Sequence, residues 1–171
     1  MNANVANLVG ITGIARRLVQ DGALAEDTAR LALEDSTQDK KTIQQYLIDK
    51  KLITSTQLAG AFASEFGLPL FDLSSMDLNQ ATHKLIPEEL ATKQMVLVLR
   101  KRGGKVFVAT SDPTNNNALD AVKFAVNAIV EPIVVAEDAL RKAIELAYNS
   151  PTDTLDDGGD DIDLDVASDE D

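Results

Sequence analysis

The sequence contains no cysteine, which excludes both a disulfide framework and a zinc site built on cysteine ligands. No apolar run approaches the ~18–20 residues that a membrane-spanning helix needs. The N-terminus also lacks the basic stretch that precedes the apolar part of a signal peptide. These absences predict a soluble, cytoplasmic protein with no direct membrane insertion.

Negative charge is concentrated near the C-terminus. Residues 152–171 hold ten acidic side chains and no Lys or Arg. Subtracting these ten from the 28 acidic residues of the chain leaves 18 against 16 basic ones, so residues 1–151 are nearly neutral. A nearly neutral body lacks the basic stripe of a nucleic-acid-binding protein, and the acidic stretch repels phosphate. We therefore expect no nucleic-acid partner, and a disordered acidic linker over residues 150–171.

Helical periodicity dominates the first part of the chain. A first helix is expected over residues 12–21, and it stops at Gly22, a residue suited to the left-handed conformation that ends helices. A second helix follows Leu24, where apolar residues recur at helical spacing. The polar cluster 35–39 is expected to connect it to a third helix at residues 41–50.

The fourth helix has the clearest start signal. Thr54 is followed three residues later by Gln57, which matches a capping box, and Gly67 ends the helix. Residues 18–24 also align with residues 47–53, 29 positions further on, which predicts two stacked helical hairpins. Any two amphipathic helix ends can be aligned in this way, so chance similarity is an equally good explanation of the repeat.

The pattern changes to a mixture of strands and helices in the second part. Two β-rich runs, residues 95–99 and 105–109, are separated by Gly103 and Gly104. Both glycines can take the positive φ that hairpin turns require. The sequence therefore predicts a β-hairpin.

Further elements surround this hairpin. A short helix is expected over residues 88–93, a longer helix after residues 112–114, and a last helix over residues 140–148. A third strand over residues 129–135 contains Pro132, which has no N–H to donate to a ladder. That strand must therefore lie at an edge of the sheet or begin at the proline.

These elements predict an α+β chain in four segments. A flexible N-terminus covers residues 1–9, and an all-α subdomain of about four short helices in two hairpins covers residues 10–72. A small α+β subdomain with a three-stranded sheet follows at residues 73–149, and the acidic linker covers residues 150–171.

The sequence does not contain the parts of a catalytic or metal site. No G-x-x-x-x-G-K-[ST] loop is present, and the sequence Gly103–Lys105 falls in the expected hairpin turn. His83 is the only histidine, and we expect it at the surface near a helix start. Residues 156–161 resemble a calcium loop superficially but lack its ligand spacing and final Glu. We expect no catalytic, cofactor-binding or metal-binding residue.

Several stretches together resemble a known family. Residues 15–22, and residues 47–53 leading into 65–73, are similar to two helical units of PilB-type type IV pilus assembly ATPases. Further along the chain, several stretches resemble the N-terminal domain that this family shares with type II secretion ATPases. These stretches are residues 85–87, 106–109, 111–114, 136–140 and 143–144. The resemblance covers almost the whole body, and it rests on the ordered set rather than on one motif.

The resemblance implies a larger protein. Members are cytoplasmic homo-hexameric ATPases that power pilus assembly at the inner membrane, and hence twitching motility. Their ATP and Mg²⁺ site would lie in a motor domain outside this chain. The N-terminal region is expected to be a non-catalytic docking domain for a PilZ-domain adaptor, which relays cyclic di-GMP signals, and possibly for the inner-membrane platform protein. The alternatives are direct binding of cyclic di-GMP, or a type II secretion ATPase docking on its membrane anchor protein.

Direct binding of cyclic di-GMP would require particular motif residues. Some relatives use paired motifs R-L-G-x-x-L-[LV]-x-x-G, in which the arginine contacts base or phosphate. Aligning on Gly22 puts residues 13–15 at R-L-G, and the second copy has residues 42–44 there, so both motif arginines are absent. Arg16 and Arg17 are displaced by about one helical turn. We therefore predict no tight binding of cyclic di-GMP.

A protein partner is expected on the helical subdomain, since its narrow core should leave apolar residues partly exposed. Filling of the helical core explains Leu24 and Leu31 equally well. The candidate interface residues are Leu8, Val9, Ile11, Leu24, Leu31 and Tyr46, with Arg16, Arg17, Lys40 and Lys41 as rim charges.

Overall fold

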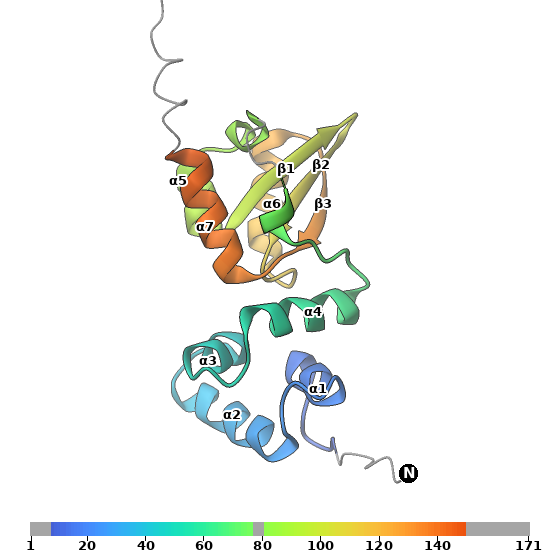
Figure 1. The fold of residues 1–171 in the computed structure, drawn as a ribbon, viewed down its shortest axis with the longest axis vertical. Coiled ribbons are helices and arrows are strands. Elements are labelled where there is room, and N and C mark those ends of the chain that lie inside the picture. Colours follow the sequence, from blue (N-terminus) through green and yellow to red (C-terminus); the bar gives the residue numbers. More distant parts are fainter. Residues whose placement is uncertain (1–7, 77–80, 150–171) are drawn as a thin grey trace, which may run out of the picture.

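The structure, a computed structural model, describes residues 8–76 and 81–149, and it confirms the α+β class. The first part is all-helical and the second surrounds a three-stranded sheet with helices (Figure 1). The first part comprises α1 (Gly13–Gln20), α2 (Glu26–Gln38), α3 (Ile43–Asp49) and α4 (Ser55–Phe66). The second comprises the 3-10 helices η1 (Leu73–Ser75) and η2 (Ala81–Leu85), then α5 (Glu88–Gln94), β1 (Val96–Arg102), β2 (Lys105–Thr110), α6 (Asn116–Val126), β3 (Ile129–Val134) and α7 (Glu137–Tyr148).

The sheet has the strand order β1-β2-β3. Strands β1 and β2 form the expected antiparallel hairpin, and Gly103 in its turn has a φ of 59°. Strand β3 runs parallel to β2, because α6 carries the chain back between them. Pro132 lies in β3, which is one of the two edge strands of the sheet, so the predicted edge position is confirmed.

The helix caps confirm much of the local prediction. Thr54 and Gln57 form the complete capping box, with reciprocal bonds of 2.9 and 3.1 Å. Gly67 ends α4 in the left-handed conformation, with a φ of 63°. Helix α3 begins two residues later than expected, since the Thr42 side chain accepts a hydrogen bond from the Gln45 amide and caps it.

Two local expectations were wrong. Residues 35–38 of the polar cluster form the end of α2, and Asp39 is its C-cap, so the cluster is not a connection. Ser36 is buried there, and its hydroxyl donates to the Leu33 carbonyl at 3.1 Å, so its polar group is satisfied within the helix. His83 is also buried, not at the surface. Its ring lies edge-on to that of Tyr148, at 5.1 Å between centroids.

The two parts of the chain are joined by backbone pairing. After α4, the chain runs beside the end of β3. The Val134 amide donates to the Pro69 carbonyl at 2.9 Å, and the Phe71 amide donates to the Val134 carbonyl at 3.0 Å. The Val134 side chain is fully buried and belongs to the core of the helical part. Figure 1 shows α4 between the other helices and the sheet.

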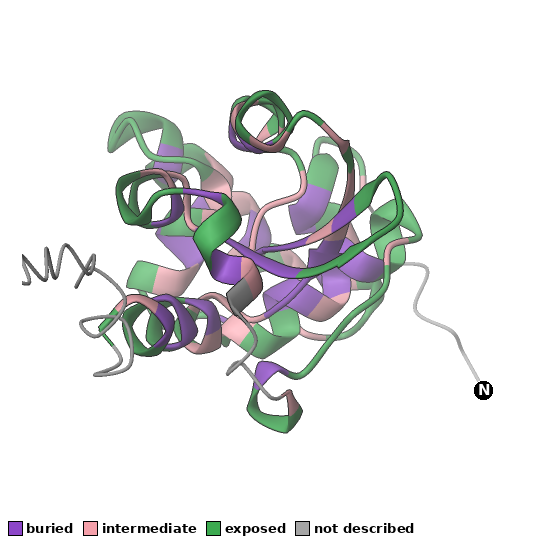
Figure 2. Cartoon of the chain, turned by 90° about the horizontal axis from the view of Figure 1, so that it is seen from above, coloured by how far each residue is buried: buried purple, intermediate pink, exposed green. Residues whose placement is uncertain are grey.

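Each part has its own hydrophobic core. Figure 2 shows the buried residues concentrated in the interior of the chain and the exposed ones around it. In the second part, β1 and β2 supply Val96, Leu97, Val106 and Val108, none more than 1% exposed. Helix α4 packs against α1 and also against β3 and α7, so it links the two cores.

Candidate partner-binding surface

The two corners of the helical part have the same backbone geometry. Gly22, between α1 and α2, has a φ of 74°, and Lys51, 29 residues later between α3 and α4, has a φ of 55°. The following helix caps, Ala25 and Thr54, each lie three residues further on. Three hydrogen bonds also recur with the same offset: Asp21 to Arg17, Gly22 to Val19 and Ala23 to Leu18 correspond to Lys50 to Tyr46, Lys51 to Ile48 and Leu52 to Leu47, amide to carbonyl. The two corners therefore share their backbone geometry at the 29-residue offset that the sequence suggested.

The corner alone is not specific to the repeat. The connection from α2 to α3 has the same three hydrogen bonds around Lys40, whose φ is 55°. What distinguishes the two repeated corners is the core on either side of them. Leu18 and Leu47 precede the corners and Leu24 and Ile53 follow them, and all four are buried. The repeat is therefore a packing unit as well as a turn.

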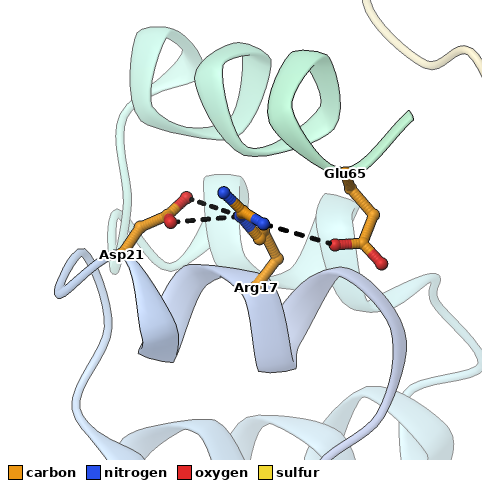
Figure 3. A network of polar contacts seen from close by, with 3 residues as sticks. All are labelled: Arg17, Asp21 and Glu65. Carbon is orange, nitrogen blue, oxygen red and sulfur yellow. Dashed lines mark hydrogen bonds and ion pairs between the residues drawn. The ribbon is translucent and has the colours of Figure 1, made fainter. Parts of the chain in front are cut away.

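Arg17 connects α1 to two carboxylates (Figure 3). Its Nε lies 3.1 Å from an Asp21 oxygen, and its Nη1 lies 4.0 Å from Glu65 on α4. These side chains are about one-third exposed, so we expect each pair to stabilise the fold by no more than about 1 kcal/mol. Arg17 is therefore engaged within the fold, whereas its neighbour Arg16 is exposed.

Arg30 is hydrogen-bonded to Val9 and directly precedes Leu31 on α2. The Arg30 side chain donates to the Val9 carbonyl at 2.6 Å and to Glu26, one turn earlier on α2, at 2.8 Å. Arg30 therefore fixes the segment before α1 against α2. The Val9 side chain is 78% exposed, and that of Leu31, the next residue on α2, is 61% exposed.

Leu31 lies on an acidic face of α2. We define the outer face of α2 as its exposed residues at helical spacing, Asp27, Leu31, Glu34, Asp35 and Gln38. Three of the five are acidic, and Leu31 is the single apolar one. The charges on the outer face of α2 are thus negative, whereas the sequence suggested basic rim residues.

The cations beyond the end of α2 are partly engaged. The Lys41 ammonium lies 2.7 Å from Asp49, and this hydrogen-bonded carboxylate raises the pKa of Lys41 above its usual value. The Tyr46 hydroxyl donates to Asp35 at 3.0 Å. Burial, and next the hydrogen bond to Asp35, raise the pKa of Tyr46. Lys40 is exposed.

The predicted interface residues thus divide into two groups. Ile11, Leu24 and Tyr46 are 1%, 5% and 8% exposed, so the expectation of partly exposed side chains was wrong for them. Their side chains belong to the hydrophobic core of the helical part, which is larger than the narrow core that we expected. Leu8 is partly buried against the same core. The others lie wholly or partly at the surface: Val9, Arg16, Arg17, Leu31, Lys40 and Lys41.

The positions that correspond to the dinucleotide motif contribute to the fold. In the first copy, Ile14 and Ala15 are 7% and 0% exposed, so neither side chain faces solvent. In the second copy, Thr42 caps α3, and Gln44 donates to Asp112 of the second part at 3.4 Å. Neither copy has an arginine side chain at these positions.

The sequence did not point to one exposed apolar segment. Phe66, Leu70 and Phe71, at the end of α4 and in the segment after it that pairs with β3, are 51%, 50% and 44% exposed. Phe66 lies one helical turn after the buried Phe62, but it is the last residue of α4 and is exposed. These residues lie at the junction of the two parts.

Across residues 8–76 and 81–149, no group of three or more His, Asp or Glu side chains is arranged to hold a metal ion. In the same two segments, no helix combines the length and the apolar character needed to cross a bilayer.

Comparison with known proteins gives consistent matches. A family model described as the MshEN domain matches residues 66–154. The type IV pilus assembly ATPases PilB of Pseudomonas aeruginosa and Acinetobacter baylyi are each 36% identical to this chain, over 91% and 85% of its length. The PilB of Myxococcus xanthus is 30% identical over 86%. These matches cover 27%, 26% and 27% of the relatives, so the chain spans about a quarter of their length.

Solved structures agree with the fold. A structure of MshE with cdg has a TM-score of 0.68 and 25% identity, and the match covers 80% of this chain and 99% of that one. The N-terminal domain of XpsE has a TM-score of 0.65 and 18% identity, and covers 77% of this chain and 91% of that one. The likeness to XpsE shows the fold alone.

Proposed function

Because the chain belongs to the MshEN domain family, we propose that it is the N-terminal docking domain of a type IV pilus assembly ATPase. In this proposal the domain itself is not catalytic, and the ATP and Mg²⁺ site lies in the part of the protein that its relatives have in addition. The PilB relatives support the pilus system, since they are type IV pilus assembly ATPases and are up to 36% identical to this chain. The whole protein would act as a homo-hexamer on the cytoplasmic side of the inner membrane.

The proposed partner is a PilZ-domain adaptor protein, with the inner-membrane platform protein as a further candidate. The observation that carries this proposal is the exposed Leu31 within the acidic outer face of α2. An apolar side chain with a charged rim is the pattern of an interface anchor. An adaptor that presents an apolar pocket bordered by cations would complement it.

A second candidate function is direct binding of cyclic di-GMP. The structure of MshE with cdg supports it, because that protein is 25% identical and almost its whole chain is matched. The residues at the motif positions argue against it here. Ile14 and Ala15 are buried, the Thr42 side chain caps α3, and Arg17 is paired with Asp21. A phosphate or guanine would have to displace these contacts.

The docking proposal can be tested with two matched leucine variants. Leu31 on α2 is 61% exposed and Leu146 on α7 is 60% exposed, so both can be changed to Asp without opening a core. Burying about 60% of a leucine side chain is worth roughly 1–2 kcal/mol, which is about a 5- to 30-fold change in Kd. Leu31→Asp should weaken capture of the PilZ-domain protein by at least this factor, and Leu146→Asp should leave it unchanged.

The experiment is a pull-down of purified PilZ-domain adaptor on the immobilised full chain, with dilution series for the three proteins. If both variants weaken capture of the adaptor equally, the interface does not lie on the outer face of α2. If the wild-type chain captures no adaptor, with or without cyclic di-GMP, the docking proposal is wrong.

A further inference from the structure

The tip of the β1–β2 hairpin is strongly basic. Arg100, Lys101, Arg102 and Lys105 are all exposed there. Lys105 pairs with Glu131 of β3 at 3.2 Å. Arg100, Lys101 and Arg102 make no ion pair within residues 8–76 and 81–149. Three adjacent cations therefore lack a carboxylate in the described part of the chain.

The register gathers these residues on one face of the sheet. Arg102 pairs with Lys105, and Lys105 pairs with Ile129. Directly paired residues point to the same face, and so does Arg100, two positions before Arg102. Ile129 is 56% exposed. We call Arg100, Arg102, Lys105 and Ile129 the hairpin surface.

The outer edge of β1 is open beside this surface. Strand β1 is the first strand of the sheet, and its Leu99 carbonyl accepts a hydrogen bond from Thr82 of η2 at 3.1 Å. Beyond that point, residues 100–102 have no strand neighbour on that side among the residues that the structure describes. Positive charge on an open edge repels another copy of the same edge, but it attracts an acidic strand.

One segment of the chain has the complementary pattern. Residues 161–166 read Asp-Ile-Asp-Leu-Asp-Val, a strict alternation of acidic and apolar residues. Alternation with a period of two is the pattern of a strand with one charged and one apolar face. We infer that this segment docks along the outer edge of β1 as an added strand, with its aspartates facing Arg100 and Arg102.

The same chain can reach this edge. Helix α7 ends at Tyr148, and the residues from 149 to 160 can span up to about 40 Å when extended. A folded body of this size has a radius of gyration of only about 14 Å. Figure 1 shows the C-terminal end of α7 and the hairpin tip at the same end of the molecule, away from α1 and α2. The contact is therefore assigned within one chain.

The absence of cysteine makes this contact measurable. A nitroxide label on Ser168→Cys in the otherwise intact chain should broaden the amide signals of residues 100–105. At roughly 20 mM salt, where the Debye length is about 20 Å, we expect those signals to lose about half of their intensity or more. At roughly 500 mM salt the loss should disappear, since the charges are then screened within about 4 Å.

Three variants of the labelled chain make the test specific. Changing Asp161, Asp163 and Asp165 together to Asn, or Arg100 and Arg102 together to Gln, should abolish the broadening. Changing Lys93 and Lys142, two exposed cations elsewhere, to Gln should leave it intact. Broadening that persists in the first two variants, or is absent from the wild-type chain at low salt, overturns the inference.

A mixed sample distinguishes broadening within one chain from broadening between two copies of the chain. Spin-labelled chain without isotope is combined with isotope-labelled chain without the spin label. No broadening in this sample supports contact within one chain. Broadening of residues 100–105 there would assign the contact to a second copy and overturn the assignment made here.

Discussion

Gly22 and Lys51, the left-handed residues at the two repeated corners, should affect the stability of the fold in opposite directions when they are substituted. Gly22 has a φ of 74°, and a Cβ added there would meet no atom within 4 Å. Gly22→Ala therefore introduces backbone strain and no steric clash. A non-glycine residue in this conformation costs about 1–2 kcal/mol. Alanine also loses less conformational entropy on folding than glycine, by roughly 0.5–1 kcal/mol. The free energy of unfolding should therefore fall by about 0.5–1 kcal/mol, the difference between the two effects.

The second corner should respond in the opposite direction. Lys51 already has a φ of 55°, so the native chain carries the strain that glycine would relieve. Glycine also loses more conformational entropy on folding, roughly 0.5–1 kcal/mol. Lys51→Gly should therefore raise the free energy of unfolding by about 0.5–1 kcal/mol, the difference between the two effects.

Thermal unfolding followed by circular dichroism measures both changes. For a chain of this size, 1 kcal/mol corresponds to a shift in Tm of about 2–4 °C. Gly104→Ala is the matched control, because Gly104 is exposed, has space for a Cβ and does not have a positive φ. If Gly22→Ala is as neutral as Gly104→Ala, or if Lys51→Gly lowers Tm, the equivalence of the two corners is refuted.

Other substitutions test the rest of the fold and one titrating group. Gly60→Ala, inside α4 with space for a Cβ, should raise the free energy of unfolding by roughly 0.5–1 kcal/mol in urea titrations. Thr54→Ala removes the capping box and should lower it by about 1 kcal/mol in the same assay. Phe62→Ala, 1% exposed in the native core, should lower it by about 3–5 kcal/mol. The side-chain and backbone hydrogen bonds from Ser74 lower the pKa of Asp72, so its stabilising effect is present above the unfolded pKa and is lost as pH falls through the folded one. A carbon NMR titration of Ser74→Ala should show the pKa of Asp72 moved up toward its usual value, and an unchanged pKa would contradict this cause.

Local signals in the sequence were sufficient where backbone chemistry alone decides the structure. The capping box at Thr54, the helix end at Gly67 and the hairpin turn at Gly103 were all predictable, because each depends on residues within a few positions. The edge position of β3 followed from Pro132 in the same way.

The features that depend on tertiary contacts were not predictable. Ser36 looked like a loop residue until its burial and its bond to Leu33 were known. Tyr46 looked like an interface residue, although its ring is buried and its hydroxyl reaches Asp35. The pairing of Val134 with the chain after α4 joins residues more than 60 positions apart, for which no sequence pattern was available.

The candidate partner-binding surface was likewise predictable only in part from the sequence. Periodicity identified Leu31 as apolar on α2 but could not decide between core and surface, and the structure places it at the surface. The acidic character of the outer face of α2 became visible only when the helix was known to continue to Gln38.

The docking role is tested by calorimetric titration of the full chain with a PilZ-domain adaptor, and separately with cyclic di-GMP. We expect saturable binding of the adaptor that is weakened by Leu31→Asp and unaffected by Leu146→Asp. We also expect no tight binding of the free dinucleotide, since both motif arginines are absent. Sub-micromolar affinity for cyclic di-GMP together with no binding of the adaptor would contradict the docking role.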